Sequence, residues 1–191
     1  MAVTWVILAG LPGTGKSTLA RAVAARIGGA VLDKDKVREA LFPGGLTDYT
    51  REQDDLCVRA MLEAARYLTE KKRAEWIFID GRTFSNHVQI DEVIAAAERA
   101  GAQWRILHVT CSDEVAEARL SRADAENPAK NRDVALYRRV KAGFEAIAYP
   151  KLEVDTTEGV EKVVEGGVRV VNRQIVMNRL CVQGYLKRVA S

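Results

Sequence analysis

The sequence contains few of the residues that build disulfide bridges and metal sites. Its 191 residues include three cysteines and two histidines. Cys57, Cys111 and Cys181 are odd in number and far apart, which favours free thiols in a reducing cytosol over disulfides or a zinc site. His87 and His108 are isolated and lack the spacing of metal ligands. Disulfide-stabilised and zinc-centred architectures are therefore not expected.

Long apolar runs and a large excess of one charge are also missing. No apolar run reaches membrane-spanning length, and the first residues lack the pattern of a secretory signal, so we expect a cytoplasmic protein with no membrane partner. The net charge of +3 is compatible with an anionic ligand but does not require nucleic acid. Length and composition are those of one globular domain over residues 1–191.

Short β-rich runs alternate with longer helical patterns. We expect strands near residues 3–9, 30–32, 76–79, 104–109 and 152–154. Helices are expected at 16–27, after Asp33 or Asp35, from Thr50 onward, and at 86–100, 113–123, 134–148 and near 157. This alternation predicts an α/β fold in three layers, with a five-stranded parallel sheet between two layers of helices.

Two further expectations concern packing and the end of the chain. The helix that begins at Thr50 is expected to turn Leu56, Met61, Ala65 and Leu68 inward. Residues from about 166 to 191 are expected to form a C-terminal extension that either covers the sheet edge or pairs with a second subunit. A homodimer is therefore one of two alternatives.

A phosphate-binding pattern follows the first expected strand. The residues Gly10, Leu11, Pro12, Gly13, Thr14, Gly15, Lys16 and Ser17 fit G-x-x-x-x-G-K-[ST]. The glycines let the backbone wrap an anion with its N–H groups, and the following helix adds its dipole. Lys16 can reach the β- and γ-phosphates of ATP, Ser17 can bind Mg²⁺, and Thr18 can bond the α-phosphate. We therefore expect ATP and Mg²⁺ as cofactors.

The strand that ends at Asp80 resembles a Walker B strand, in which a carboxylate holds Mg²⁺ or its waters. The next residue is Gly81, where mechanical ATPases usually have a glutamate that activates water. This favours transfer to a substrate over hydrolysis. The guanine-reading Asn-Lys-x-Asp pattern is absent, which favours ATP over GTP.

Charged residues follow the second strand, at the edge where parallel sheets bind ligands. A carboxylate of Asp33 or Asp35 can accept the proton of an acceptor hydroxyl, and which of the two does so stays open. Arg38 shares a helix face with Asp35 and can bind an anionic group of the acceptor or the transferring phosphoryl group. Arg82, just beyond Asp80, is a further candidate for contact with the acceptor.

A lid over the nucleotide is expected at about residues 119–133. Arg119 and Arg122 share a helix face before a polar loop, and guanidinium groups there can neutralise charge on the γ-phosphoryl oxygens. Lys130 and Arg132 are weaker candidates for the same role. A loop that closes over ATP also excludes water.

Taken together, these elements resemble P-loop kinases related to the phage polynucleotide 5′-hydroxyl kinase and to zeta-toxin, of the AAA_33 type. The resemblance covers roughly residues 3–155 and is carried by Gly10–Thr18, Asp35-x-x-Arg38, Asp80 and the Arg119/Arg122 pair. It implies that Asp35 is the general base and that Arg38 lies near the acceptor. The lid arginines are three residues apart, where the polynucleotide kinase has four, so the phosphate that each contacts stays open.

The expected activity is that of an ATP-dependent phosphotransferase with an alcohol group as acceptor. The hydroxyl-bearing substrate is a small molecule or a nucleic-acid 5′-end, and the small net charge favours the small molecule. Two alternatives stay open, a nucleoside or nucleotide kinase and a non-catalytic ATP-binding switch that controls a partner.

Overall fold

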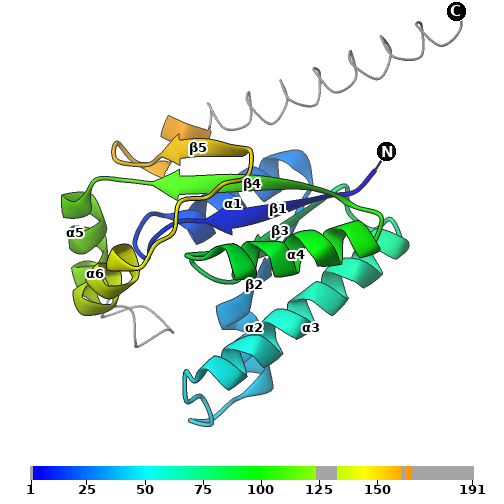
Figure 1. Ribbon diagram of the computed structural model, residues 1–191, viewed down its shortest axis with the longest axis horizontal. Coiled ribbons are helices and arrows are strands. Elements are labelled where there is room, and N and C mark those ends of the chain that lie inside the picture. Colours follow the sequence, from blue (N-terminus) through cyan, green and yellow to red (C-terminus); the bar gives the residue numbers. More distant parts are fainter. Residues whose placement is uncertain (1, 124–132, 161, 165–191) are drawn as a thin grey trace, which may run out of the picture.

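The computed structural model describes residues 2–123, 133–160 and 162–164, and in it the chain folds around one parallel sheet (Figure 1). The five strands lie in the order β2-β3-β1-β4-β5, and each pair of neighbours is parallel. The strands are β1 (Thr4–Ala9), β2 (Ala30–Asp33), β3 (Trp76–Asp80), β4 (Gln103–Thr110) and β5 (Lys151–Asp155). The five expected strands are thus confirmed.

Helices cover both faces of this sheet. They are α1 (Lys16–Ile27), α2 (Lys34–Leu41), α3 (Arg51–Glu70), α4 (His87–Arg99), α5 (Asp113–Ala123) and α6 (Val134–Ala142). On one face, Leu19 and Val23 of α1 pack against the sheet in a cluster that includes Phe78. On the other, α3 and α4 contribute Met61 and Ile90 to a second core. The three-layer α/β/α architecture is therefore confirmed.

The parallel arrangement collects the carboxyl ends of the strands at one edge of the sheet. β1 runs directly into Gly10, β2 ends at Asp33, and β3 ends at Asp80. Asp33 and Asp80 are register partners on neighbouring strands. Helices α5 and α6 lie beyond this edge, on the side toward which the strand arrows point in Figure 1. Open parallel sheets bind ligands at such an edge.

The expected helix at 134–148 is shorter than predicted. α6 ends at Ala142, with Gly143 as its C-cap. The backbone N–H of Glu145 donates to the carbonyl of Ser85 at 2.8 Å, so this residue bonds the loop before α4 instead of continuing a helix. A tertiary hydrogen bond has replaced an intrahelical one.

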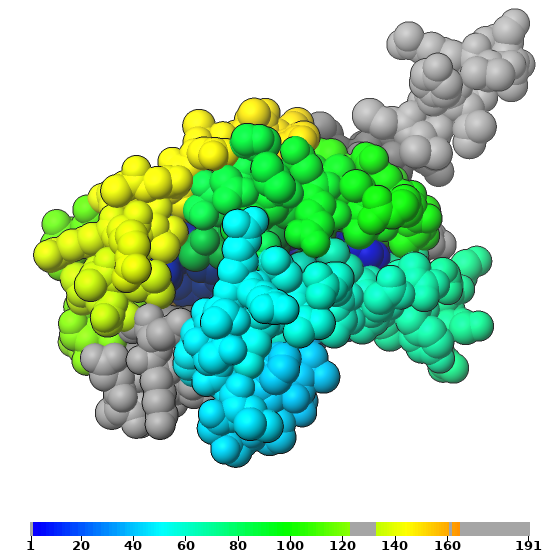
Figure 2. Space-filling view, turned by 60° about the horizontal axis from the view of Figure 1, so that its bottom comes forward, coloured from blue at the N-terminus to red at the C-terminus, as the bar shows by residue number. Residues whose placement is uncertain are grey.

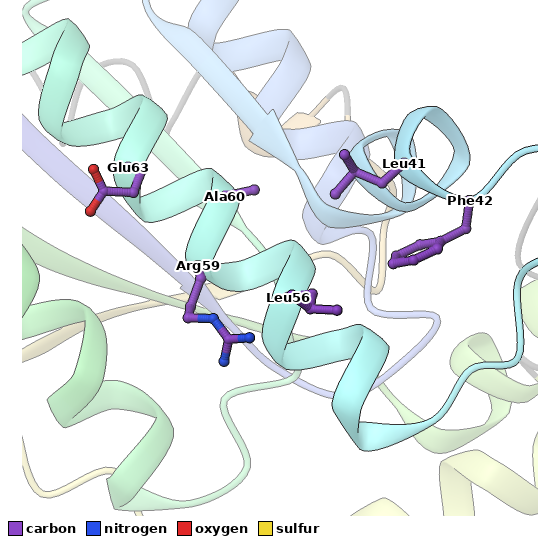
Figure 3. Close-up of a pocket in the computed structure, with 6 residues that line it drawn as sticks. All are labelled: Leu41, Phe42, Leu56, Arg59, Ala60 and Glu63. Atoms are coloured by element: carbon purple, nitrogen blue, oxygen red, sulfur yellow. The ribbon is translucent and has the colours of Figure 1, made fainter.

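The expected inward position of Leu56 is wrong, whereas Met61 and Ala65 are buried as predicted. Leu56 is 41% exposed because the buried stripe of α3 runs through Gln53, Cys57, Met61 and Ala65 at four-residue spacing. Figure 3 shows Leu56 and Ala60 on the side of α3 that faces the end of α2, with Leu41 and Phe42 opposite. The four side chains line a small apolar groove between these helices.

Several expectations lie outside the described residues. They are the lid loop from residue 124 to 132, with Lys130 and Arg132, the extension from 166 to 191, and Cys181. Within the described part, Cys57 and Cys111 are free thiols. No helix there is both long and apolar enough to cross a bilayer.

Trp5 offers a test of the packing. Its side chain is fully buried, and Nε1 donates to the hydroxyl of Thr69 at 2.9 Å. We expect Trp5→Phe to lower the free energy of unfolding by about 1–3 kcal/mol, because it leaves a void and removes a buried hydrogen bond. Urea denaturation measures the change.

Trp104→Phe is the matched control, because the bond from Trp104 to Glu98 is exposed. An equal loss of stability in both variants would contradict the assigned role of Trp5.

Candidate functional site

The loop between β1 and α1 has the backbone of an anion cradle. Gly10 has a φ of 141°, and a Cβ there would collide with the carbonyl of Val109. Gly15 has a φ of 87° and is the N-cap of α1, without a side-chain capping bond and with no acidic residue in the first turn. The first turn of α1 thus carries no acidic side chain of its own, and the positive end of this helix suits an anionic ligand.

Lys16 lies across this loop. Its ammonium group donates to the carbonyls of Gly10 and Leu11 at 2.9 and 2.7 Å. The hydroxyl of Thr14 donates to the carbonyl of Leu11 at 2.9 Å, and the N–H of Gly10 donates to the carbonyl of Thr83 at 3.0 Å. The loop is thus held in shape from inside and from the segment that follows β3.

Arg119 fastens the same loop to the end of β5. Its guanidinium group donates to the carbonyl of Gly13 at 3.3 Å and to the carbonyl and hydroxyl oxygens of Thr156 at 2.7 and 3.0 Å. Thr156 is fully buried, and its hydroxyl donates to the carbonyl of Thr14 at 2.8 Å. The sequence analysis did not single out Thr156. Its position directly after the last strand could have indicated that it lies at the same edge of the sheet as the phosphate loop.

A cavity of about 1410 Å³ joins this loop to the charged segment after β2. Figure 2 shows a recess in which dark blue atoms of the N-terminal part are seen between the cyan and yellow segments. The predicted site residues that line the cavity are Pro12, Gly13, Gly15, Lys16, Ser17, Thr18, Asp33, Asp35, Arg38, Asp80, Arg82 and Arg119.

Four predicted residues lie outside that lining. Gly10, Leu11 and Thr14 are not among the lining residues and shape the loop from behind. Arg122 is exposed in the last turn of α5 and does not line the cavity. Its role on a phosphate stays a prediction.

The two candidate bases have different surroundings. Asp33 is the N-cap of α2, where its carboxylate accepts from the N–H groups of Asp35 and Lys36. It also pairs with Arg21 at 3.5 Å. Both residues line the cavity, but the carboxylate of Asp35 bonds Arg38 at 3.0 Å and caps no helix. Asp33 is thus committed to capping, and this favours Asp35 as the reactive carboxylate.

Arg38 is buried and held from several sides. Besides Asp35, its guanidinium group bonds Asp54 on α3, and it lies over the ring of Tyr49 with 5.2 Å to the centroid. Asp54 also pairs with Lys34 at 2.8 Å. Sequence reasoning found Arg38 and Asp35 but missed Asp54 and Tyr49, which reach them only through the packing of α2 against α3.

Arg82 forms a second paired cation along the cavity. Its guanidinium group bonds Asp55 and lies 4.0 Å from Glu92. Asp80, two residues earlier, is 8% exposed at the end of β3 and also lines the cavity. A buried carboxylate beside the phosphate loop has the donor chemistry that Mg²⁺ prefers.

The two described thiols are not set up as nucleophiles. Burial raises the pKa of Cys57, despite the nearby positive charges of Arg38 and Lys34. Burial likewise raises the pKa of Cys111. Both stay protonated near neutral pH, so the chemistry of this site depends on its oxygen and nitrogen groups.

Comparison with solved structures places this fold among proteins with kinase names. A candidate kinase from Chloroflexus aurantiacus aligns with a TM-score of 0.74 and 21% identity over 92% of this chain and 97% of that one. The APS kinase CysC of Mycobacterium tuberculosis, in complex with AMPPNP and APS, gives 0.65 and 15% over 90% and 98%. A gluconokinase from Sinorhizobium meliloti gives 0.60 and 15% over 92% and 97%. These likenesses show a shared fold.

No curated protein sequence matches the chain. A family model does match, over residues 6–147, which include the phosphate loop, Asp35, Arg38, Asp80 and both arginines of α5. The match spans well over half of the 191 residues. The chain therefore belongs to the AAA_33 family, described as an AAA domain, and its fold is that of the P-loop kinases that it resembles.

Proposed function

We propose that the protein is an ATP-dependent kinase that transfers the γ-phosphate of ATP to a hydroxyl group of an acceptor. The observation that carries the proposal is the shared cavity, whose lining includes Lys16 and Ser17 of the phosphate loop together with Asp35. A phosphate-binding loop alone fits many ATP-binding proteins. A carboxylate across the cavity from it is what phosphoryl transfer to an alcohol requires.

At the nucleotide end, backbone N–H groups of residues 13–18 would bind the phosphates of ATP. Lys16 would leave the carbonyls of Gly10 and Leu11, which it bonds at 2.9 and 2.7 Å, and bind the β- and γ-phosphates. Phosphate oxygens carry negative charge and carbonyl oxygens do not, so this exchange favours the position of Lys16 on the nucleotide. Arg119, already bonded to the carbonyl of Gly13, would lie beside the nucleotide.

Mg²⁺ fits this end of the cavity as a partner of ATP. Ser17 and Asp80 line the cavity and would hold the ion or its waters. Among the described residues there is no cluster of three or more acidic, histidine or cysteine side chains that could hold a metal by itself. Mg²⁺ usually keeps several waters and takes nucleotide phosphates as ligands, which agrees with so few protein donors. When bound, Mg²⁺ would neutralise negative charge on the phosphates of ATP.

At the acceptor end, Asp35 would accept the proton of the hydroxyl as that oxygen attacks the γ-phosphorus. The bond from Arg38 to one oxygen of Asp35 fixes the direction of the carboxylate. Gly81 follows Asp80, in the place where a glutamate that activates water would stand in mechanical ATPases. These features favour transfer to an acceptor over hydrolysis and over a role as a nucleotide switch.

We expect Lys16→Ala to reduce ATP turnover at least about 100-fold, because the charge that binds the β- and γ-phosphates is lost. Steady-state kinetics with labelled ATP measures the effect. Lys71→Ala at the exposed C-cap of α3 is the matched control and should turn over ATP at the wild-type rate. Unchanged turnover in Lys16→Ala would falsify the assignment of the phosphate loop.

Asp35→Asn tests the acceptor end. The amide cannot accept the proton, so phosphoryl transfer to a panel of alcohols should fall by about 10²–10⁴-fold while the Kd for ATP changes less than about threefold. Isothermal titration and a single-turnover assay give the two quantities. Glu63→Gln, on the exposed face of α3 beside Arg66, is the control. Transfer that persists at the wild-type rate in Asp35→Asn would rule out Asp35 as the group that accepts the proton.

A further inference from the structure

The cations that reach into the acceptor part of the cavity are already neutralised by carboxylates. Arg38 bonds both Asp35 and Asp54, and Lys34 bonds Asp54. In these pairs the cation is the more deeply buried partner. The side chain of Arg38 is 6% exposed and that of Lys34 is 12% exposed, against 19% for Asp35 and 29% for Asp54. An acceptor that enters the cavity therefore meets carboxylate oxygens before it meets the cations.

The contacts of Arg38 explain why it is not available to bind an anion. Its Nη1 bonds Asp35, its Nη2 bonds Asp54, and Tyr49 covers the guanidinium group at 5.2 Å. A phosphate or carboxylate on the acceptor would have to displace one of these carboxylates and lie against the other. Like charges at such short range cost several kcal/mol in binding. The same side chain instead serves well as a fixed partner of Asp35.

Arg82, the next cation along the lining, follows the same pattern. Arg82, 12% exposed, is paired with Asp55 and lies near Glu92, and these two acids are 38% and 43% exposed. The exposed charged residues of the lining outside these pairs carry both signs, namely Arg21, Lys36, Arg51 and Arg59 with Glu39 and Glu145. In the ion pairs of Arg38, Lys34 and Arg82 the carboxylate is thus the more exposed partner in every case.

We propose that the acceptor is an uncharged alcohol, such as a sugar, a sugar alcohol or a nucleoside, and that Asp54 is the residue that determines this specificity. The inference rests on the kinase function proposed above and narrows its substrate class. Asp54 binds Arg38 and Lys34 together, so that neither cation recruits a phosphate or carboxylate of the acceptor. It acts through these two side chains and is a positioning residue.

The test compares acceptors that differ only in an anionic group. Each pair offers the same reactive hydroxyl, for example adenosine with adenosine 3′-monophosphate and sorbitol with gluconate, in an assay with γ-labelled ATP. In the wild-type protein, the uncharged member should have a kcat/KM at least about tenfold higher. A wild-type preference for the anionic members would overturn the inference and leave the kinase function standing.

Asp54→Asn removes the negative charge that Arg38 and Lys34 share, so the ratio of kcat/KM should shift at least about tenfold toward the anionic acceptor, mainly through KM. Asp54→Glu restores the carboxylate and should recover the wild-type preference. Glu63→Gln, on the same helix and outside the cavity lining, should leave the ratio unchanged. A loss of kcat for all acceptors in Asp54→Asn, with no change in the ratio, would assign Asp54 a merely structural role.

Binding of the same panel separates failure of the inference from failure of the proposed function. If no acceptor gains phosphate although ATP binds, the kinase proposal fails. The rise in Tm of the ATP-bound protein then still reports the charge preference. The uncharged members should raise Tm and the anionic ones should not, and the reverse order would overturn the inference.

Discussion

The parallel pairing of β1 with β3, and of β3 with β2, is the constraint on which the site depends. It ends the strands at a common edge, so that Gly10, Asp33 and Asp80 emerge side by side although they are far apart in sequence. The glycine loop leads directly into α1, and the chain passes from β2 into α2 at Asp33. The sheet thus sets where the cavity lies, and residues of α3, α4, α5 and α6 complete its lining.

Charge is handled differently at the two ends of this cavity. At the phosphate loop, the helix N-terminus has no acidic residue in its first turn, and Lys16 and Arg119 lie against carbonyl oxygens. At the other end, Arg38 is enclosed by carboxylates and an aromatic ring. Removing a charged group from water is unfavourable unless it is paired and hydrogen-bonded, so these contacts are what keep Arg38 buried. In the function proposed above, the first end would bind the phosphates of ATP and the second an acceptor without negative charge.

The sequence predicted the strands, the phosphate loop and the candidates Asp35 and Arg38 because each depends on local pattern. Alternating β-rich and helical segments predict a parallel sheet, and glycine spacing predicts the loop. Asp54 and Tyr49 could not be found in this way, since they contact Arg38 only when α3 packs against α2. The error at Leu56 has a similar origin, because a helix with several apolar faces does not reveal which one meets the sheet. The end of α6 depended on the bond from Glu145 to Ser85, which is a long-range contact.

The central claim is that a triphosphate on the glycine loop lies in line with the carboxylate of Asp35. A crystal structure with a non-hydrolysable ATP analogue and Mg²⁺ measures this directly, through the distance from the γ-phosphorus to that carboxylate. The account predicts about 5–7 Å, with room for one hydroxyl oxygen between them. A γ-phosphate that points away from Asp35, with the carboxylate more than about 10 Å distant, would contradict it.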